Sequence, residues 1–163
     1  MRQMALSILV DNTAGVLSRV AGLFSRRGYN IDSLTVGVTE DPKFSRMTVV
    51  VTGEEVILDQ IKKQLSKLID VREIIELPSD ASVCRELILV KVMATLEQRA
   101  AVIAVADIFR AKVVDVSNNA LMLELTGNQA KLAAFIELLD GFQITELART
   151  GITGLPRGAG NLK

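Results

Sequence analysis

The strongest constraint on the fold is an order of strand and helix patterns that occurs twice along the chain. From residue 2 to residue 77, segments with alternating apolar residues, typical of strands, are separated by two segments with the apolar spacing of an amphipathic helix. The predicted strands span residues 2–10, 31–39, 45–52 and 71–77, and the predicted helices span residues 16–27 and 54–69. The first round therefore reads strand, helix, strand, strand, helix, strand, with a hairpin between the two middle strands.

The second round follows residues 78–82, whose Pro, Ser and Asp content is typical of a short linker. Its predicted strands span residues 85–93, 112–116, 121–125 and 143–147, and its predicted helices span residues 96–109 and 128–139. Asn128 is the expected cap of the last helix. The two halves share no residue-level repeat, and the glycine-rich segment from residue 150 to residue 163 is predicted to be irregular.

This order predicts an α+β fold made of two consecutive ferredoxin-like βαββαβ modules. Each module places two helices on one face of a four-stranded antiparallel sheet. We expect one domain over residues 1–78 and a second over residues 83–163, the latter ending in the irregular tail. A module of about 75 residues that buries only one sheet face is marginally stable, so association between modules or between chains is expected.

The composition narrows the possible functions. The chain contains no histidine, which excludes a Ser-His-Asp triad, a Cys-His pair and imidazole metal sites. Lys plus Arg and Asp plus Glu both number 19, so no net field attracts a polyanion, and bulk binding of nucleic acid or an acidic membrane surface is disfavoured. A carboxylate or lysine enzyme remains open.

Two other functions of a βαββαβ module have weak support. RNA binding requires exposed aromatic residues on the central strands. The first and third predicted strands instead carry the aliphatic or thioether side chains Met4, Leu6, Ile8, Met47, Val49 and Val51. A small acylphosphatase-like hydrolase would use Arg19 and Asn30 to hold its substrate, but a solvated helix residue is the better interpretation of Arg19.

Two polar segments are candidate binding positions. Residues 11–15, DNTAG, join the first strand to the first helix. They are either an ordinary connection with a helix cap or a helix start whose backbone N–H groups bind an anion such as a carboxylate. Asn30 is either a polar strand end or an amide that accepts from an ammonium and donates to a carboxylate. Neither asparagine performs acid-base chemistry, so this set favours binding without reaction.

Four stretches together resemble a known family. They are N-x-x-G-x-L-S-R-V at 12–20, R-G-Y-N-I at 27–31, S-R-M-T at 45–48 and LARTGITGLPRG at 147–158. The chain resembles the regulatory small subunit of acetohydroxyacid synthase, also called acetolactate synthase, over essentially its whole length. The resemblance implies that the first module is an ACT domain, an amino-acid-sensing βαββαβ unit.

The resemblance also implies a site and a partner copy. In the family, two ACT domains pair through edge strands, and valine binds at their interface between the loop of one chain and the second strand of the other. The implied effector residues are Asn12, Gly15, Val16, Leu17, Asn30 and Ile31, with Leu34 and Val36 as further candidates. No catalytic residue and no metal ligand is assigned to this chain.

The implied function is that of a non-catalytic regulatory subunit. It would activate the catalytic large subunit and confer feedback inhibition by valine in branched-chain amino-acid biosynthesis, including that of isoleucine. Thiamine diphosphate, Mg²⁺ and FAD are expected on the large subunit, and no cofactor on this chain. An ACT-type sensor regulating a different enzyme is the alternative. A single cysteine, Cys84, and the lack of a run of about 18 apolar residues fit a soluble, cytoplasmic protein.

Overall fold

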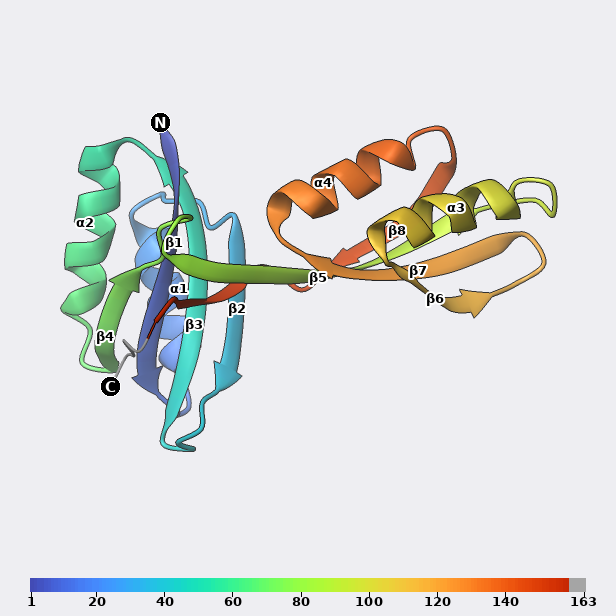
Figure 1. Cartoon of the computed structure of the whole chain (residues 1–163). Helices are drawn as coiled ribbons and strands as arrows, with labels where there is room; N and C mark the ends of the chain where they lie inside the picture. Colours follow the sequence, from blue (N-terminus) through green and yellow to red (C-terminus); the bar gives the residue numbers. More distant parts are fainter. Residues whose placement is uncertain (159–163) are drawn as a thin grey trace. The chain divides into compact units, whose positions relative to one another are not determined.

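A computed structural model describes residues 1–158 of the chain (Figure 1). The chain divides into two compact units. The first comprises Met1–Cys84 together with the segment that starts at Ile152, and the second comprises Arg85–Gly151. Each unit has its own hydrophobic core.

The first unit has the predicted order of elements. They are β1 (Arg2–Asp11), α1 (Val16–Arg26), β2 (Ser33–Val38), β3 (Phe44–Gly53), α2 (Glu55–Ser66) and β4 (Val71–Glu76). The strands form one antiparallel sheet in the order β2-β3-β1-β4, so β2 and β4 are its edge strands. The α+β fold class and the ferredoxin-like order are confirmed.

The core of the first unit lies between α1, α2 and one face of this sheet. Alternate residues of the central strands point into it, and Leu6 of β1 lies opposite Val49 of β3. The helices contribute Phe24 from α1 and Leu58 and Ile61 from α2, all almost fully buried. Apart from Phe24, the buried core residues of this unit are aliphatic residues and methionine.

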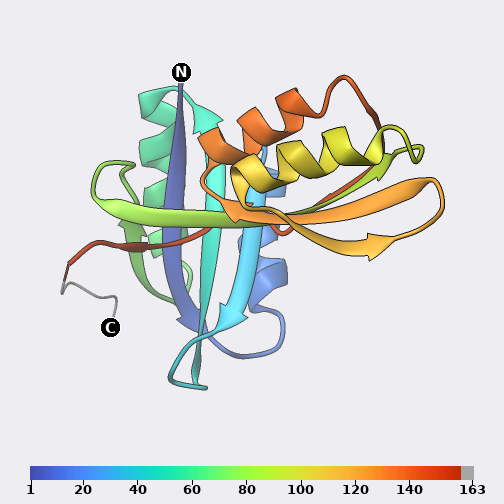
Figure 2. The same ribbon diagram turned by 45° about the vertical axis from the view of Figure 1, so that its right-hand side comes forward.

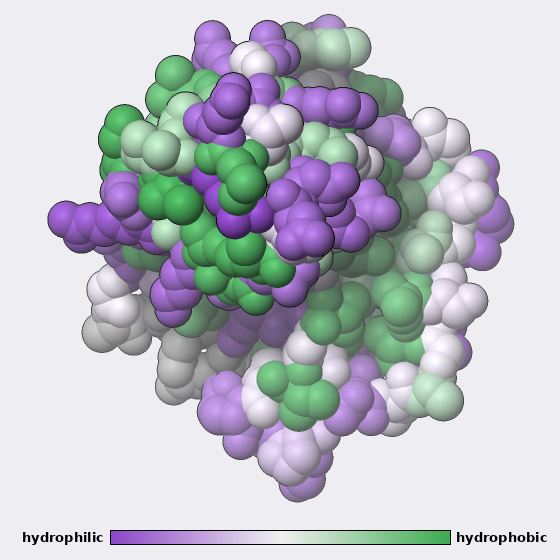
Figure 3. Space-filling view, turned by 90° about the vertical axis from the view of Figure 1, so that its right-hand side faces the viewer, coloured by the Kyte–Doolittle hydropathy of each residue, from purple (hydrophilic) through white to green (hydrophobic). Residues whose placement is uncertain are grey.

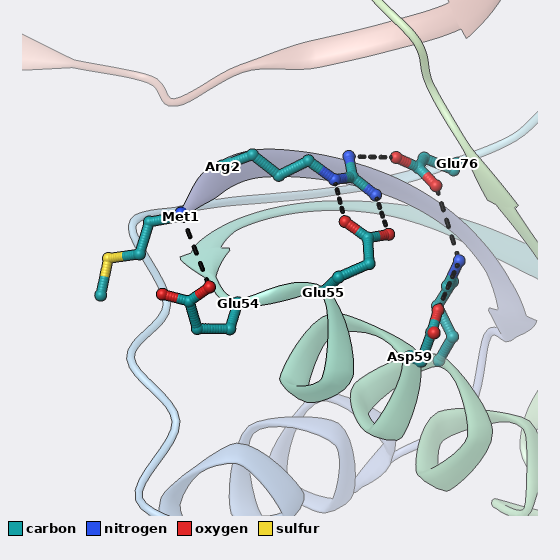
Figure 4. Close-up of polar contacts among 7 residues, drawn as sticks. Met1, Arg2, Glu54, Glu55, Asp59 and Glu76 are labelled. Atoms are coloured by element: carbon teal, nitrogen blue, oxygen red, sulfur yellow. Dashed lines mark hydrogen bonds and ion pairs between the residues drawn. The ribbon is translucent and has the colours of Figure 1, made fainter.

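An ion-pair network holds β1 to α2 and β4 on the surface of the first unit (Figure 4). The Arg2 guanidinium donates to both carboxylate oxygens of Glu55, at 2.7 and 3.0 Å, and to Glu76 at 2.6 Å. Lys62 lies 3.6 Å from Glu76 and 3.5 Å from Asp59. The hydrogen bonds from Arg2 lower the pKa of Glu55 and the pKa of Glu76 below the ordinary value of 4.5.

The second unit repeats the order of elements. They are β5 (Ser82–Met93), which begins in the first unit, α3 (Arg99–Phe109), β6 (Lys112–Val116), β7 (Ala120–Gly127), α4 (Gln129–Leu138) and β8 (Gln143–Arg149). The sheet order is β6-β7-β5-β8. Asn128 caps α4 as predicted, because its Oδ1 accepts a hydrogen bond from the backbone N–H of Lys131 at 2.9 Å.

The surface of the second unit includes large apolar side chains. Leu96 before α3 is 75% exposed, and Ile108 within α3 is 71% exposed. Hydrophobic residues accordingly appear among hydrophilic ones in the space-filling view (Figure 3). Among residues 1–158, no helix combines the length and the hydropathy needed to cross a membrane.

The C-terminal segment differs from the prediction. Residues Thr153–Pro156 form a strand, β9, which pairs with β5, and the segment from Ile152 on belongs to the first unit. The expectation of an irregular tail is therefore wrong for these residues, and its part over 159–163 lies outside the described residues. The two compact units thus divide the chain differently from the expected domains 1–78 and 83–163.

Candidate functional site

The loop between β1 and α1 leaves the start of the helix without a side-chain cap. Gly15 occupies the N-cap position in the left-handed conformation, with φ of 86°, where a side chain would be strained. The first N–H groups of a helix have no partner within the helix, and the helix dipole favours an anion beside them. This end of α1 can therefore accept a carboxylate.

Arg19, one turn into α1, lies over the same loop. An added Cβ at Gly15 would lie 2.9 Å from a terminal nitrogen of the Arg19 guanidinium. The Arg19 Nε donates to the carboxylate of Asp70 at 2.5 Å, and this hydrogen bond raises the pKa of Arg19 above its ordinary value. Arg19 was predicted to be a solvated helix residue, and its side chain is 48% exposed, although its partner Asp70 is only 8% exposed. The Arg19–Asp70 pair thus ties the start of α1 to the segment just before β4.

Asn12 holds the loop against the turn between β2 and β3. Its side-chain Nδ2 donates to the backbone oxygen of Pro42 at 2.9 Å, and its Oδ1 accepts from the hydroxyl of Ser45 at 3.2 Å. Its backbone N–H donates to the oxygen of Lys43 at 2.8 Å. A side-chain amide has two N–H donors and two lone pairs, so Asn12 retains capacity for a ligand.

Asp11 fixes the other end of the loop. Its backbone N–H donates to the oxygen of Asp70 at 2.9 Å. Its carboxylate accepts from Arg72 at 2.7 and 3.0 Å, and this hydrogen bonding raises the pKa of Arg72. The sequence analysis missed Asp70 and Arg72, because they follow α2 and no local pattern relates them to residues 11–19.

Val16 and Leu17 have different surroundings. The Val16 side chain is 4% exposed and belongs to the core of the first unit, so it can present only its backbone N–H to a ligand. The Leu17 side chain is 48% exposed. Of the two apolar candidates at this end of α1, Leu17 is the one whose side chain can contact a bound molecule.

Asn30 and Ile31 lie beyond the other end of α1. The Asn30 Nδ2 donates to the carboxylate of Asp32 at 2.9 Å, and the side chain of Ile31 is half-buried against the core. The eleven residues of α1 correspond to a helix of about 16 Å. Within one chain, Asn12 and Gly15 are therefore brought together, whereas Asn30 lies at the opposite end of the helix.

The other two candidates belong to β2. Leu34 packs against the core, whereas Val36 is 47% exposed on this edge strand. Within residues 1–158, no group of His, Cys, Asp and Glu has the arrangement of a metal site.

Comparisons with known proteins agree along the whole chain. Residues 6–73 match the family model described as AHAS small subunit-like ACT domain, and residues 85–158 match the model described as small subunit of acetolactate synthase. The chain is 51% identical over 155 residues to a probable acetolactate synthase small subunit of Methanothermobacter thermautotrophicus, covering 94% of this chain and 92% of the relative. It is 48% identical over 154 residues to the acetolactate synthase isozyme 3 small subunit of Escherichia coli, covering 94% of both.

A solved structure agrees as well. The crystal structure of the acetolactate synthase small subunit from Thermotoga maritima is similar to this chain with a TM-score of 0.89 and 40% sequence identity. The similarity covers 98% of this chain and 99% of that chain. Both the residue pattern and the fold are thus those of one family.

Proposed function

Because the chain belongs to the family of acetolactate synthase small subunits, we propose that it activates a catalytic large subunit and makes the activity of that subunit sensitive to valine. In this proposal the chain senses the end product of branched-chain amino-acid biosynthesis and performs no chemistry itself. A sensor that regulates a different enzyme is the alternative, and the curated relatives do not favour it.

The uncapped start of α1 is the observation that carries the proposal. We place the valine carboxylate at the backbone N–H groups that follow Gly15, where the helix dipole favours a negative charge. Asn12 orients the polar end of the ligand, and Leu17 contacts its isopropyl group. A ligand that accepts hydrogen bonds from several N–H groups needs no titratable protein group, which agrees with a chain that contains no histidine.

The proposed site requires two chains. Asn30 and Gly15 lie at opposite ends of α1, so a single valine reaches both only if Asn30 comes from a second copy. The edge strand β2, which follows Asn30, exposes Val36 and Val38, and we propose that two ACT domains pair along this edge into a homodimer. Valine binding and dimer geometry are then thermodynamically linked.

Inhibition follows from this linkage. Valine stabilises one arrangement of the ACT dimer, and that arrangement supports the large subunit less well. A coupling free energy of about 1 to 3 kcal/mol changes affinity by about 5- to 150-fold. In this scheme thiamine diphosphate, Mg²⁺ and FAD lie on the large subunit, and the assembly is cytoplasmic.

Calorimetric titration of the isolated chain with valine tests the proposal, with leucine, isoleucine and alanine as comparisons. We expect saturable valine binding with one site per chain or one per pair of chains. Leucine and isoleucine are discriminated by at most about 1 to 3 kcal/mol, because they differ from valine by one methylene.

The Asn30→Ala variant identifies the site. It is expected to lose valine binding and valine inhibition while it still activates the large subunit. Asn118→Ala, in the turn between β6 and β7 of the second unit, is the matched control and is expected to behave like the wild type. Full valine sensitivity of Asn30→Ala would show that the site is assigned to the wrong residues.

A further inference from the structure

The central strands β1 and β3 of the first unit's sheet are buried on both faces, although the helices cover only one. Ser7 and Leu9 of β1 alternate with the core residues of that strand and so point to the face opposite the helices. Ser7 is fully buried and Leu9 is 4% exposed. Thr48 and Val50 of β3, on the same face, are each 1% exposed. Other segments of the chain therefore cover this second face along β1 and β3.

The cover is the chain's own C-terminal strand together with the first residues of β5. Figures 1 and 2 both show the red C-terminal strand alongside the first part of β5, across the face of this sheet. The backbone of Ile152 is hydrogen-bonded to β2 twice. Its oxygen accepts from the Thr35 hydroxyl at 3.0 Å, and its N–H donates to the Ser33 hydroxyl at 2.9 Å. We call residues Ile152–Pro156 the C-terminal strap.

A glycine allows the strap to approach β5 closely. A Cβ added at Gly154 would lie 2.6 Å from the Cys84 sulfur, 3.0 Å from the backbone oxygen of Val83 and 3.1 Å from the Leu77 side chain. The position is constrained by contact, since the backbone oxygen cannot rotate out of the way as the end of a flexible side chain can. A larger residue at position 154 must displace the strap or the Cys84 side chain.

The surface beneath the strap is partly polar and incompletely filled. Arg46 donates to the buried hydroxyl of Ser7 at 3.1 Å, and the buried hydroxyl of Thr48 has no hydrogen-bond partner among the described residues. A groove of about 340 Å³ lies between β2, Arg46 and the strap residues Thr153–Leu155. The contact between the strap and β2 consists of two hydroxyl hydrogen bonds beside this groove, and it costs less to break than a close-packed apolar core.

We propose that the C-terminal strap binds reversibly to the first unit and couples strand β2 to the second unit. The chain enters the second unit at Arg85, directly after Cys84, which lies against the strap, and leaves it at Gly151, directly before the strap. Strand β2 begins three residues after Asn30. A ligand that orders the start of β2 therefore stabilises the Ser33 and Thr35 contacts of the strap. This last step rests on the proposed function.

Cys84, the sole cysteine of the chain, reports strap release because its sulfur lies against Gly154. The experiment measures the rate at which a small maleimide modifies Cys84 in the full-length chain. Gly154→Val is expected to raise this rate about tenfold by shifting the strap toward its released state. Gly141→Val is the matched control, because a Cβ at Gly141 meets nothing within 4 Å, and its rate is expected to be that of the wild type.

A second variant tests the proposal even if Gly154→Val misfolds. Thr35→Val keeps the shape of the side chain and removes the hydrogen bond to Ile152, and it is expected to raise the rate about threefold. If Thr35→Val, with the circular dichroism spectrum of the wild type, reacts at the rate of the Gly141→Val control, the strap does not open as proposed.

The rate of Cys84 modification at saturating valine distinguishes a failure of the strap proposal from a failure of the proposed function. We expect valine to slow modification of Cys84 in the wild type about threefold, because order at β2 favours the bound strap. An unchanged rate in a chain that binds valine by calorimetry would overturn the coupling. Absence of valine binding would instead overturn the proposed function, while the ligand-free rates still test the strap.

Discussion

The two units share one order of elements but differ in the segment that precedes their first helix. In the second unit, Thr95 and Gln98 precede α3 and satisfy each other: the Thr95 N–H donates to the Gln98 side chain at 3.1 Å, and the Gln98 N–H donates to the Thr95 hydroxyl at 3.3 Å. This exchange has the chemistry of a capping box. In the first unit, Gly15 offers no side chain to the start of α1.

The difference teaches that duplicating a fold does not duplicate a site. The N-cap residues Gly15 of α1 and Gln98 of α3 both lack a side-chain cap hydrogen bond, but only the start of α1 adjoins a loop that Arg19 and Asn12 hold in place for a ligand. The proposed effector site therefore belongs to the first unit alone.

The largest effect is expected from giving the first unit the Thr-x-x-Gln pattern of the second. In the double variant Asn12→Thr with Gly15→Gln, the Asn12 amide is lost and a strained side chain at position 15 meets Arg19, so the loop that presents the N–H groups assigned to the valine carboxylate is distorted. Hydrogen bonds to a charged group are worth about 1.5 to 3 kcal/mol, so valine affinity should fall about ten- to hundredfold in calorimetry.

The reciprocal variant, Thr95→Asn with Gln98→Gly, is the control for this change. It should leave valine binding at the wild-type value while it lowers the stability of the second unit. Wild-type valine affinity in the Asn12→Thr and Gly15→Gln chain would show that the start of α1 does not hold the ligand.

Sequence reasoning predicted the elements better than the contacts between them. Strands such as β1 and helices such as α1 were predictable because alternation and helical spacing are local properties of the residues that form them. Strand β9 was missed because TGLP contains a glycine and a proline and has no alternating apolar pattern. Its hydrogen bond to Thr35 joins residues 117 positions apart, for which a single sequence carries no signal.

The same limit applies to the candidate site. The loop at Asn12 and Gly15 was predictable from small and polar residues at a helix start, and its position there is confirmed. The pairing of Arg19 with Asp70 was not predictable, since it joins residues 51 positions apart and depends on how α2 returns the chain to β1. The binding roles of Asn12, Gly15 and Asn30 stay predictions.

A moderate effect is expected at the support of the first helix start. Asp70→Asn removes the negative charge that pairs with Arg19 and should lower the free energy of unfolding by about 1 to 2 kcal/mol. Urea denaturation measures this change. Asp59→Asn is the matched control, because Asp59 pairs with Lys62 at 3.5 Å on the surface and its loss should cost at most about 0.5 kcal/mol. Equal losses in the two variants would mean that the Arg19 pair is no more than a surface contact.

The smallest effect concerns pH and the Arg2 network of the first unit. The folded pKa values of Glu55 and Glu76 lie below their unfolded value, so these carboxylates stabilise the fold fully above pH 4.5 and lose this contribution as the pH falls through their folded pKa values. In the Arg2→Met variant the unfolding midpoint should therefore decrease less between pH 6 and pH 3 than in the wild type. In the second unit Lys91 pairs with Glu146, and Lys91→Met is expected to reduce the pH dependence of the unfolding midpoint in the same way. A slope unaffected by Arg2→Met would assign the acid sensitivity to other groups.

The most direct test of the central claim is a backbone amide NMR titration of the ¹⁵N-labelled chain with valine. We predict the largest chemical shift changes at Val16, Leu17 and Ser18 at the start of α1 and at Asn30 and Ile31, with none at the start of α3. Shifts at Thr95 and Gln98, or saturation without any change at residues 16–18, would contradict the claim that the uncapped helix start of the first unit is the effector site.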